Sequence, residues 1–210
     1  MIIPKLLNIA LSFTKRFHID ESHALGHSIN VLHYVHEIKM HECKNYPILN
    51  EQESVIYASA ILHDVCDKKY VDEQKSWKLL KRDIRKENLL TEQELDAVHQ
   101  IISTMSYSTV KEKGFPDLHE YNMAYHVVRE ADLLTAYDFD RSLIYNMNNV
   151  DSDFLGSYPN ACTVMDTRVM MHLEDGLFIT KHGERLAKQL EKEVIHRMVQ
   201  WHWLLNGKIV

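Results

Sequence analysis

Helix-breaking residues are rare along this chain. Only 6 Gly and 4 Pro occur among 210 residues, so few positions can interrupt a helix. Apolar side chains recur at spacings of three and four, which is the period of a helix with one buried face. No stretch of alternating β-branched residues predicts a strand. The sequence therefore predicts an all-α fold.

Helix-start signals locate individual helices in this pattern. Asn50 and Thr91 are each followed, three residues later, by Glu and then by an apolar run, which is the signature of a capping box. The segments 107–118, 148–159 and 174–183 contain most of the Gly and Pro and are expected as loops. Helices are expected at about residues 4–17, 22–42, 51–65, 72–87, 92–105, 120–137, 141–147, 160–173 and 184–205.

Length and composition favour one domain. Hydrophobic residues make up 45% and charged residues 26% of the chain, which is ordinary for a globular protein and excludes a disordered or collagen-like one. No polar stretch is long enough to be a domain linker. Residues 1–210 are therefore predicted to form a single all-α domain. Its core is expected at about residues 20–140, with a C-terminal helical extension packed on it.

Charge and cysteine usage narrow the partners and the compartment. The chain has 24 Lys and Arg against 30 Asp and Glu, and its net charge of -6 disfavours nucleic acid as a partner. No apolar run approaches the roughly 20 residues of a membrane span, so no membrane partner is expected. Cys43, Cys66 and Cys162 are odd in number and scattered, which is typical of free thiols in the cytoplasm.

Four residues carry the chemistry: His27, the neighbours His63 and Asp64, and Asp132. Each lies beside an apolar run of an expected helix, where His and Asp are costly to bury unless they are paired or bind a metal. Taken singly, each has a plain alternative, such as a core histidine or a chance dipeptide. Together they form a nitrogen and oxygen ligand set that suits Mn, Mg, Fe, Ni, Co or Zn. Four ligands leave two positions of a six-coordinate ion open, for an activated water and a substrate.

The order of these residues resembles the H…HD…D signature of the HD-domain metal-dependent phosphohydrolases. Their local contexts are similar as well: Gly26-His27-Ser28 before an apolar helix, ASAILHDV at 58–65 and READLL at 129–134 resemble the family's three ligand segments. The match spans about residues 20–140. The resemblance implies a helical HD-domain bundle with one divalent metal ion. It also implies hydrolysis of a phosphomonoester or phosphoanhydride of a small metabolite, in particular a nucleotide.

The sequence departs from the family pattern at three places. Glu130 stands where many members have Asp, and Leu134 where many have Arg or a polar residue. Met105-Ser106 stands where many place a further His, which favours a mononuclear site. These departures leave open a non-catalytic HD-type sensor that binds a nucleotide. A third alternative is a structural metal in a helical interaction protein.

Residues that follow the His-Asp pair are candidates for catalysis. The resemblance implies that Asp67 is a general acid or base, although an ordinary helix-end carboxylate explains it equally well. Lys68 and Lys69 are expected to hold phosphate oxygens, since an ammonium beside a metal stabilises transition-state charge. Two solvated loop lysines are the alternative.

Two further residues are candidates for contacting the substrate. Asp72 lies eight residues after Asp64, where the resemblance implies contact with a sugar hydroxyl, although a helix N-cap is the favoured interpretation. His23 lies four residues before His27 and is either a substrate contact or a surface histidine. The expected partner is thus a small phosphorylated molecule, and a homodimer through the C-terminal helix stays open.

A basic stripe on one expected helix is a candidate binding surface for an anionic substrate or a nucleic-acid backbone. Its members are spaced by three and four and are interleaved with acidic residues, which favours a solvated, ion-paired helix face. The stripe consists of Lys75, Lys78, Arg82 and Arg85.

Overall fold

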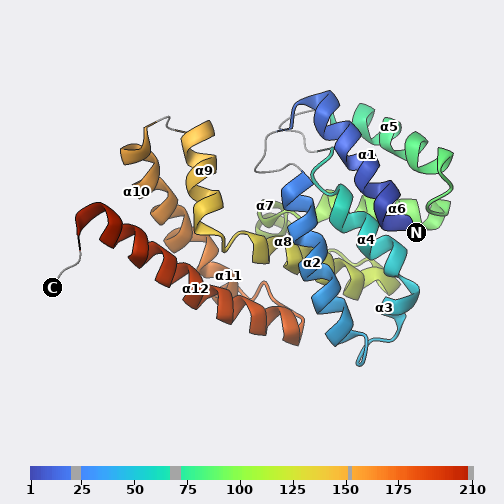
Figure 1. Cartoon of the computed structure of the whole chain (residues 1–210). Helices are drawn as coiled ribbons and strands as arrows, with labels where there is room; N and C mark the ends of the chain where they lie inside the picture. The colour runs from blue at the N-terminus through green and yellow to red at the C-terminus, as the bar shows by residue number, and fades with distance from the viewer. Residues whose placement is uncertain (20–24, 67–71, 151–152, 208–210) are drawn as a thin grey trace. The chain divides into compact units, whose positions relative to one another are not determined.

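The computed structural model of the chain is built from helices joined by short connections, and it describes residues 1–19, 25–66, 72–150 and 153–207 (Figure 1). These ranges contain no strand, so the predicted all-α fold is confirmed. The chain divides into two compact units, Met1–Asp132 and Leu133–Val210. The grouping of both units into one domain stays a prediction. None of the described helices is both long and apolar enough to cross a membrane.

The first unit holds the helices that carry the four candidate residues. In chain order its helical elements are α1 (Ile2–Phe17), α2 (Leu25–Glu42), α3 (Ile48–Glu51), α4 (Glu53–Leu62), α5 (Glu73–Lys86), α6 (Glu92–Thr104), α7 (Tyr107–Lys113), a 3-10 turn (His119–Tyr121) and α8 (Asn122–Thr135). The last three residues of α8 belong to the second unit.

Helix α4 is the centre of the first unit. Every residue from Val55 to Leu62 is buried, so the helix is covered on all sides. It packs against α1, α2 and α6. Helix α2 contributes an apolar face with the buried residues Val31, Val35 and Ile38, spaced by three and four. This central packing holds α2 against α4, and His27 and His63 belong to these two segments.

Helices α5 and α6 run antiparallel and are joined by charged and aromatic side chains. Arg85 of α5 forms two hydrogen bonds, of 2.7 and 2.6 Å, with Glu92 of α6. Lys81 pairs with Asp96 at 3.1 Å. Further along the pair, a Trp77–His99 stack has its ring centroids 4.4 Å apart.

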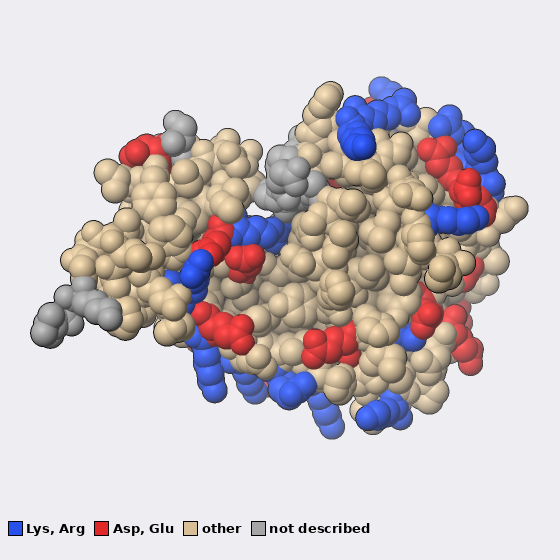
Figure 2. Space-filling model, viewed as in Figure 1, with Lys and Arg blue, Asp and Glu red and all other residues tan. Residues whose placement is uncertain are grey.

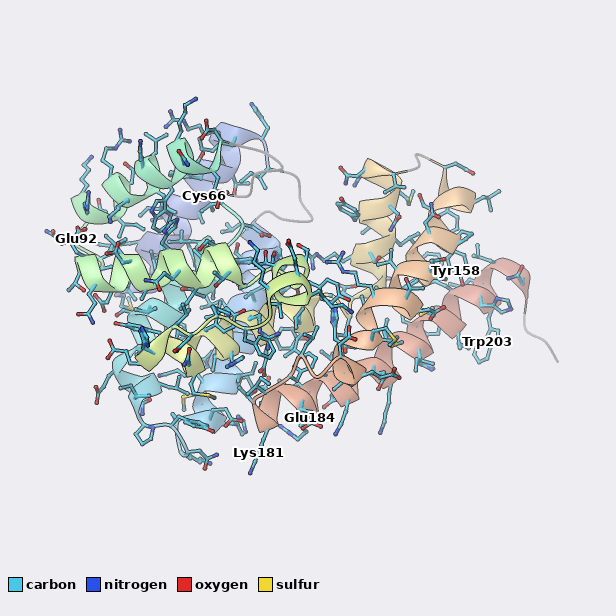
Figure 3. All side chains as sticks on the ribbon, turned by 180° about the vertical axis from the view of Figure 1, so that it is seen from behind. Cys66, Glu92, Tyr158, Lys181, Glu184 and Trp203 are labelled. Atoms are coloured by element: carbon cyan, nitrogen blue, oxygen red, sulfur yellow. The ribbon has the colours of Figure 1, made fainter. Side chains whose placement is uncertain are left out.

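The outer face of the first unit is formed by α1, α5 and α6 (Figure 1). Figure 3 places Glu92 and Cys66 at opposite ends of the α5–α6 pair. In Figure 2, Lys and Arg side chains gather over α1 and α5 with acidic side chains among them.

The basic stripe of α5 is paired with acidic side chains. Lys75 pairs with Asp72, and Arg82 pairs with Asp83. The ion-paired interpretation of the basic stripe is therefore confirmed for these members and for Arg85.

The second unit is a smaller helical bundle. Its helices are α9 (Phe139–Asn149), α10 (Phe154–Val164), a π-helical turn (Met165–Val169), α11 (Met171–Glu174) and α12 (Lys181–Asn206). Helix α9 packs against α10 and α12. Asp140 of α9 accepts hydrogen bonds from Arg197 Nε and from Trp201 Nε1 of α12, the latter at 2.7 Å. The Asp140 carboxylate thus links α9 to α12 by hydrogen bonds.

Several helix ends differ from those expected. The capping box at Thr91 is confirmed, with side-chain bonds in both directions to Glu94. The box at Asn50 is wrong: α3 begins directly after Pro47, so Asn50 is inside a helix, and α4 begins after Gln52 without a side-chain cap.

Two of the expected loops contain helix. Within 107–118, Ser106 caps a short helix, α7, by accepting a hydrogen bond from the Thr109 backbone. Within 148–159, α10 begins at Phe154 and includes Pro159. Pro159 lies in the middle of this helix, so the usual inference that Pro ends a helix failed here.

The cap at Thr91 provides a test of the fold. Replacing it in Thr91→Ala removes the hydroxyl that accepts from the Glu94 backbone, and should lower the free energy of unfolding by about 1 kcal/mol. Urea unfolding followed by circular dichroism measures the change. Thr167→Ala, at an exposed position away from any cap, is the matched control and should change stability by less than about 0.5 kcal/mol. Equal losses in both variants would contradict the assignment.

Candidate metal centre

The four candidate residues come from three helices of the first unit. His27 lies in the first turn of α2, and His63 is the residue at which α4 ends. Asp64 follows in the turn after α4, and Asp132 lies in the last turn of α8. Residues separated by up to 105 positions are thus brought to one place by helix ends, as the sequence predicted.

The distances between their polar atoms are short. The Nε2 atoms of His27 and His63 are 3.0 Å apart. Asp64 Oδ2 lies 3.3 Å from the first of these nitrogens and 3.4 Å from the second. Asp132 Oδ1 lies 3.2 and 3.6 Å from the same two nitrogens. Both carboxylates therefore face the pair of imidazoles.

These separations match those between ligands of one metal ion. Two ligand atoms that are each about 2.1 Å from an ion lie about 3.0 Å apart at a right angle and about 3.4 Å apart at a tetrahedral angle. His27, His63 and Asp64 form a group that can hold a metal ion. Asp132 extends it with an oxygen close to both nitrogens. The donor set is the mixed nitrogen and oxygen set that the sequence indicates.

The end of α4 orients the His63 ring. Its Nδ1 is 2.9 Å from the carbonyl oxygen of Ala60, one of the last carbonyls of the helix, which have no intrahelical partner. An Nδ1–H that donates to this carbonyl leaves the Nε2 lone pair free to face the cluster. Metal-binding histidines are commonly held in this way, with the second nitrogen bonded to a backbone carbonyl.

Asp64 has an acceptor that the protein itself does not satisfy. Its Oδ2 is buried and has no hydrogen-bond partner among the described residues, although two imidazoles lie nearby. A buried carboxylate oxygen in this state is costly unless a cation or a donor binds it. This atom therefore fits a metal ion better than it fits a purely structural cluster.

Exposure differs between the nitrogen and the oxygen ligands. The side chains of His27 and His63 are 3% and 4% exposed, whereas those of Asp64 and Asp132 are 15% and 29% exposed. Solvent and small molecules can consequently approach the cluster from the carboxylate side.

The four groups shift one another's protonation. Burial lowers the pKa of His27, and the hydrogen bond that its ring donates to Asp132 only partly offsets this effect. Burial also acts to lower the pKa of His63, but the negative charge of Asp64 and the contact with the Asp132 carboxylate outweigh it and raise that pKa well above its usual value. Against the effect of their own burial, the imidazoles lower the pKa of Asp64 and hold that of Asp132 well below its usual value. The protein alone thus keeps a proton on His63 between two carboxylates, where a cation would compete with it.

A buried ion pair in α8, close to Asp132 along the chain, was not expected from the sequence. Arg129 is 1% exposed and Glu130 is fully buried, and the guanidinium Nη2 lies 3.6 Å from Glu130 Oε1. In the sequence, Glu130 is only a departure from the pattern of the HD-domain phosphohydrolases. A signal was nevertheless present: Arg129-Glu130 interrupts the apolar run formed by Val127, Val128 and Ala131, all of which are buried.

The remaining predicted site residues are placed only in part. His23, Asp67, Lys68 and Lys69 lie outside the described residues. Asp72 is the N-cap of α5, and its Oδ1 accepts a hydrogen bond of 3.1 Å from the Lys75 backbone. The favoured capping role is confirmed, and a role of Asp72 in substrate binding stays a prediction.

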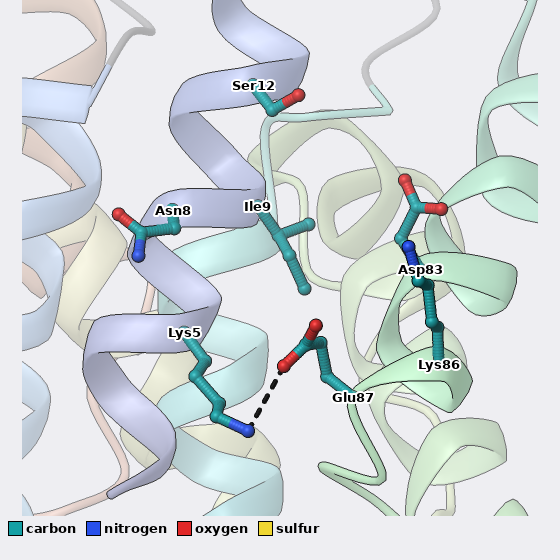
Figure 4. A pocket seen from close by; sticks show the side chains of 7 residues that line it. All are labelled: Lys5, Asn8, Ile9, Ser12, Asp83, Lys86 and Glu87. Atoms are coloured by element: carbon teal, nitrogen blue, oxygen red, sulfur yellow. Dashed lines mark ion pairs between the residues drawn. The ribbon is translucent and has the colours of Figure 1, made fainter.

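A surface groove elsewhere in this unit does not involve the cluster. Its volume is about 330 Å³, and it lies between α1 and α5 (Figure 4). Lys5 and Glu87 form a 3.1 Å ion pair across it. The residues lining it are Lys5, Asn8, Ile9, Ser12, Asp83, Lys86 and Glu87. None of the four clustered residues belongs to this set.

Metal binding tests the cluster directly. The native protein should bind one Mn²⁺ or Zn²⁺ per chain, measured by isothermal titration calorimetry. His63→Ala removes a ligand and should weaken binding by at least about 100-fold, since even changes outside the ligand set cost about 10- to 100-fold. His99→Ala removes a histidine that stacks on Trp77 of α5 and serves as the matched control. Equal affinities in all three proteins would contradict the assignment.

The pKa shifts predict the direction of the pH dependence. Below the raised pKa of His63 its ring is protonated, and an incoming ion must displace that proton. Metal affinity should therefore fall as the pH is lowered and rise with pH up to that pKa. Titrations at pH 7 in buffers of different ionisation enthalpy should show release of about one proton per ion. Binding without proton release would contradict this protonation state.

Comparisons with known proteins add no family to this picture. The chain matches no protein-family model, no curated protein and no solved structure. The resemblance to HD-domain phosphohydrolases accordingly depends on the order and local contexts of His27, His63, Asp64 and Asp132.

Proposed function

We propose that this protein is a metal-dependent phosphohydrolase that cleaves a phosphomonoester or phosphoanhydride of a small metabolite, with a nucleotide as the expected substrate class. One observation carries the proposal: His27, His63, Asp64 and Asp132 converge with ligand-like spacing from three helices. The order of these residues along the chain, which resembles the HD signature, supports it independently.

The chemistry of the proposal needs little from the protein beyond positioning. A divalent ion, when bound, polarises a phosphoryl oxygen and lowers the pKa of water. The protein's own residues determine where this happens: Ala60 orients His63, and the partly exposed Asp132 marks the side from which a substrate arrives. Because the imidazoles lower the pKa of both carboxyl groups, Asp64 and Asp132 are ionised at neutral pH.

Further roles follow from the resemblance. Asp67 is proposed to take part in proton transfer, and Lys68 and Lys69 to hold the phosphate. His23 and Asp72 are proposed to contact the rest of the substrate. The three cysteines are free thiols, which fits the cytoplasm as the proposed compartment.

A nucleotide-binding sensor is the second candidate, and one observation favours it. Glu130, which replaces the Asp of the family pattern, is fully buried and pairs with Arg129. A carboxylate in this state does not reach a substrate. The sensor would use the same metal ligands to hold a nucleotide without turning it over.

Phosphate release distinguishes the two candidates. Purified protein is tested on a panel of nucleotides and sugar phosphates with added Mn²⁺ or Mg²⁺. The native protein should release phosphate, and Asp64→Ala should lose both metal binding and turnover, since it removes the buried Oδ2 acceptor. Asp96→Ala removes an exposed carboxylate that pairs with Lys81 and should retain full activity.

The hydrolase and the sensor predict different results in this experiment. Activity that survives in Asp64→Ala would refute the metal-dependent mechanism. A native protein that binds metal and is stabilised against heat by a nucleotide, but releases no phosphate from any compound, would establish the sensor instead.

A further inference from the structure

The last turns of helix α12 carry exposed apolar side chains on the side that faces away from α9. We infer that this face binds the same face of a second copy of the chain, so that the protein forms a two-fold symmetric dimer. The inference does not depend on the metal centre or on the proposed hydrolase, because the residues that form the face all lie in α12.

One side of α12 is fixed against α9 and α10. Val194 is buried, and Trp201 Nε1 donates a hydrogen bond of 2.7 Å to Asp140 of α9. Arg197 donates to the same carboxylate, and the Trp201 ring has its centroid 5.6 Å from that of Phe154 of α10. These contacts determine which side of α12 is turned inward.

A second apolar stripe lies on the opposite side of the same turns. Ile195, Val199 and Trp203 follow one another at intervals of four residues and are 49%, 38% and 42% exposed. Because a helix turns by about 100° per residue, this stripe points about 170° away from the mean direction of Val194, Arg197 and Trp201. Large apolar side chains on both sides of a helix are typical of a helix that is buried all round. The outer stripe therefore indicates a further apolar surface against α12.

The charge distribution favours a second copy of the chain over a membrane surface. No Asp, Glu, Lys or Arg occurs from residue 198 to residue 207, and the surface over the last turns of α12 is uncharged in Figure 2. Helices that lie on membranes carry Lys or Arg along their polar face, and the net charge of -6 opposes anionic lipid. In a two-fold dimer a patch meets its own copy, so a patch of one charge repels itself and an uncharged patch does not.

The exposed apolar area of α12 is also that of a dimer interface. Leu204 and Leu205 of the last turn flank the stripe and are exposed as well. From their exposed fractions, the five residues leave about 450 Å² of apolar surface, close to the roughly 450–520 Å² that each partner contributes to an interface of standard size. The face is thus large enough for a stable symmetric contact.

Val199 is the centre of the inferred pairing. Ile195 and Trp203 lie four residues on either side of it. An antiparallel pair of α12 helices, with the two-fold axis at Val199, therefore places Ile195 of each copy opposite Trp203 of the other. This direction also opposes the two helix dipoles and keeps the charged residues 191–193 of the two copies apart, at the rim of the contact.

Like charges at the centre of the interface test the pairing. The native chain should sediment as a dimer in analytical ultracentrifugation. Val199→Glu and Val199→Lys each bring two like charges into contact and should raise the dimer dissociation constant by at least about 100-fold. An equimolar mixture of the two variants should form a mixed dimer, because opposite charges then face each other. Met40→Glu replaces an exposed apolar residue of α2 and should leave the dimer intact.

The mixture separates loss of the contact from loss of the fold, since only folded chains can recover the dimer, and circular dichroism verifies the helix content of each variant. Dimers that persist in both Val199 variants would overturn the inference. Folded, monomeric variants that form no mixed dimer would overturn it as well.

A monomeric native chain would also overturn the inference. If that monomer sediments with phosphatidylglycerol vesicles, the face of α12 binds a membrane surface instead. None of these results depends on phosphate release or on metal binding, so the dimer and the proposed function can fail separately.

Discussion

The close approach of two imidazoles governs the arrangement of the first unit. The Nε2 atoms of His27 and His63 are 3.0 Å apart in a place that excludes nearly all solvent. Two buried nitrogens at this distance cannot both carry a proton without strong repulsion, so the pair needs either one shared proton or a metal ion. The start of α2 and the end of α4 must coincide for this contact to exist. The fully buried helix α4 provides that coincidence, because its neighbours fix it on every side.

Much of this could be predicted from the sequence because the relevant signals are local. The apolar run before His63 predicts a buried helix, and α4 confirms it, although α4 ends at Leu62 and the expected helix continued to residue 65. Thr91 predicts a helix start through a capping box that spans only four residues. The convergence of His27, His63, Asp64 and Asp132 was predicted from their order and contexts, although no single one of them is diagnostic. Local pattern and the cost of burying polar groups were sufficient for this part of the site.

The rest could not be predicted, because it depends on tertiary contacts. Asn50 has the sequence of a cap, but Pro47 starts a helix three residues earlier, and the start signals compete. Ser106 follows an expected helix end, and only its bond to Thr109 shows that a new helix begins there. The pairing of Arg129 with Glu130 was equally hidden. Adjacent residues on a helix usually point in different directions, so sequence alone suggests separate surface charges and not one buried pair.

That buried pair explains the length of the carboxylate side chain at this position. An Asp in place of Glu130 would have a shorter side chain, and contact with the guanidinium of Arg129 would require it to approach more closely. Glu130 reaches Arg129 at 3.6 Å while both side chains stay buried, and the aromatic rings of Phe115 and Tyr125 enclose the cation. The longer carboxylate and the arginine therefore form one unit in this chain.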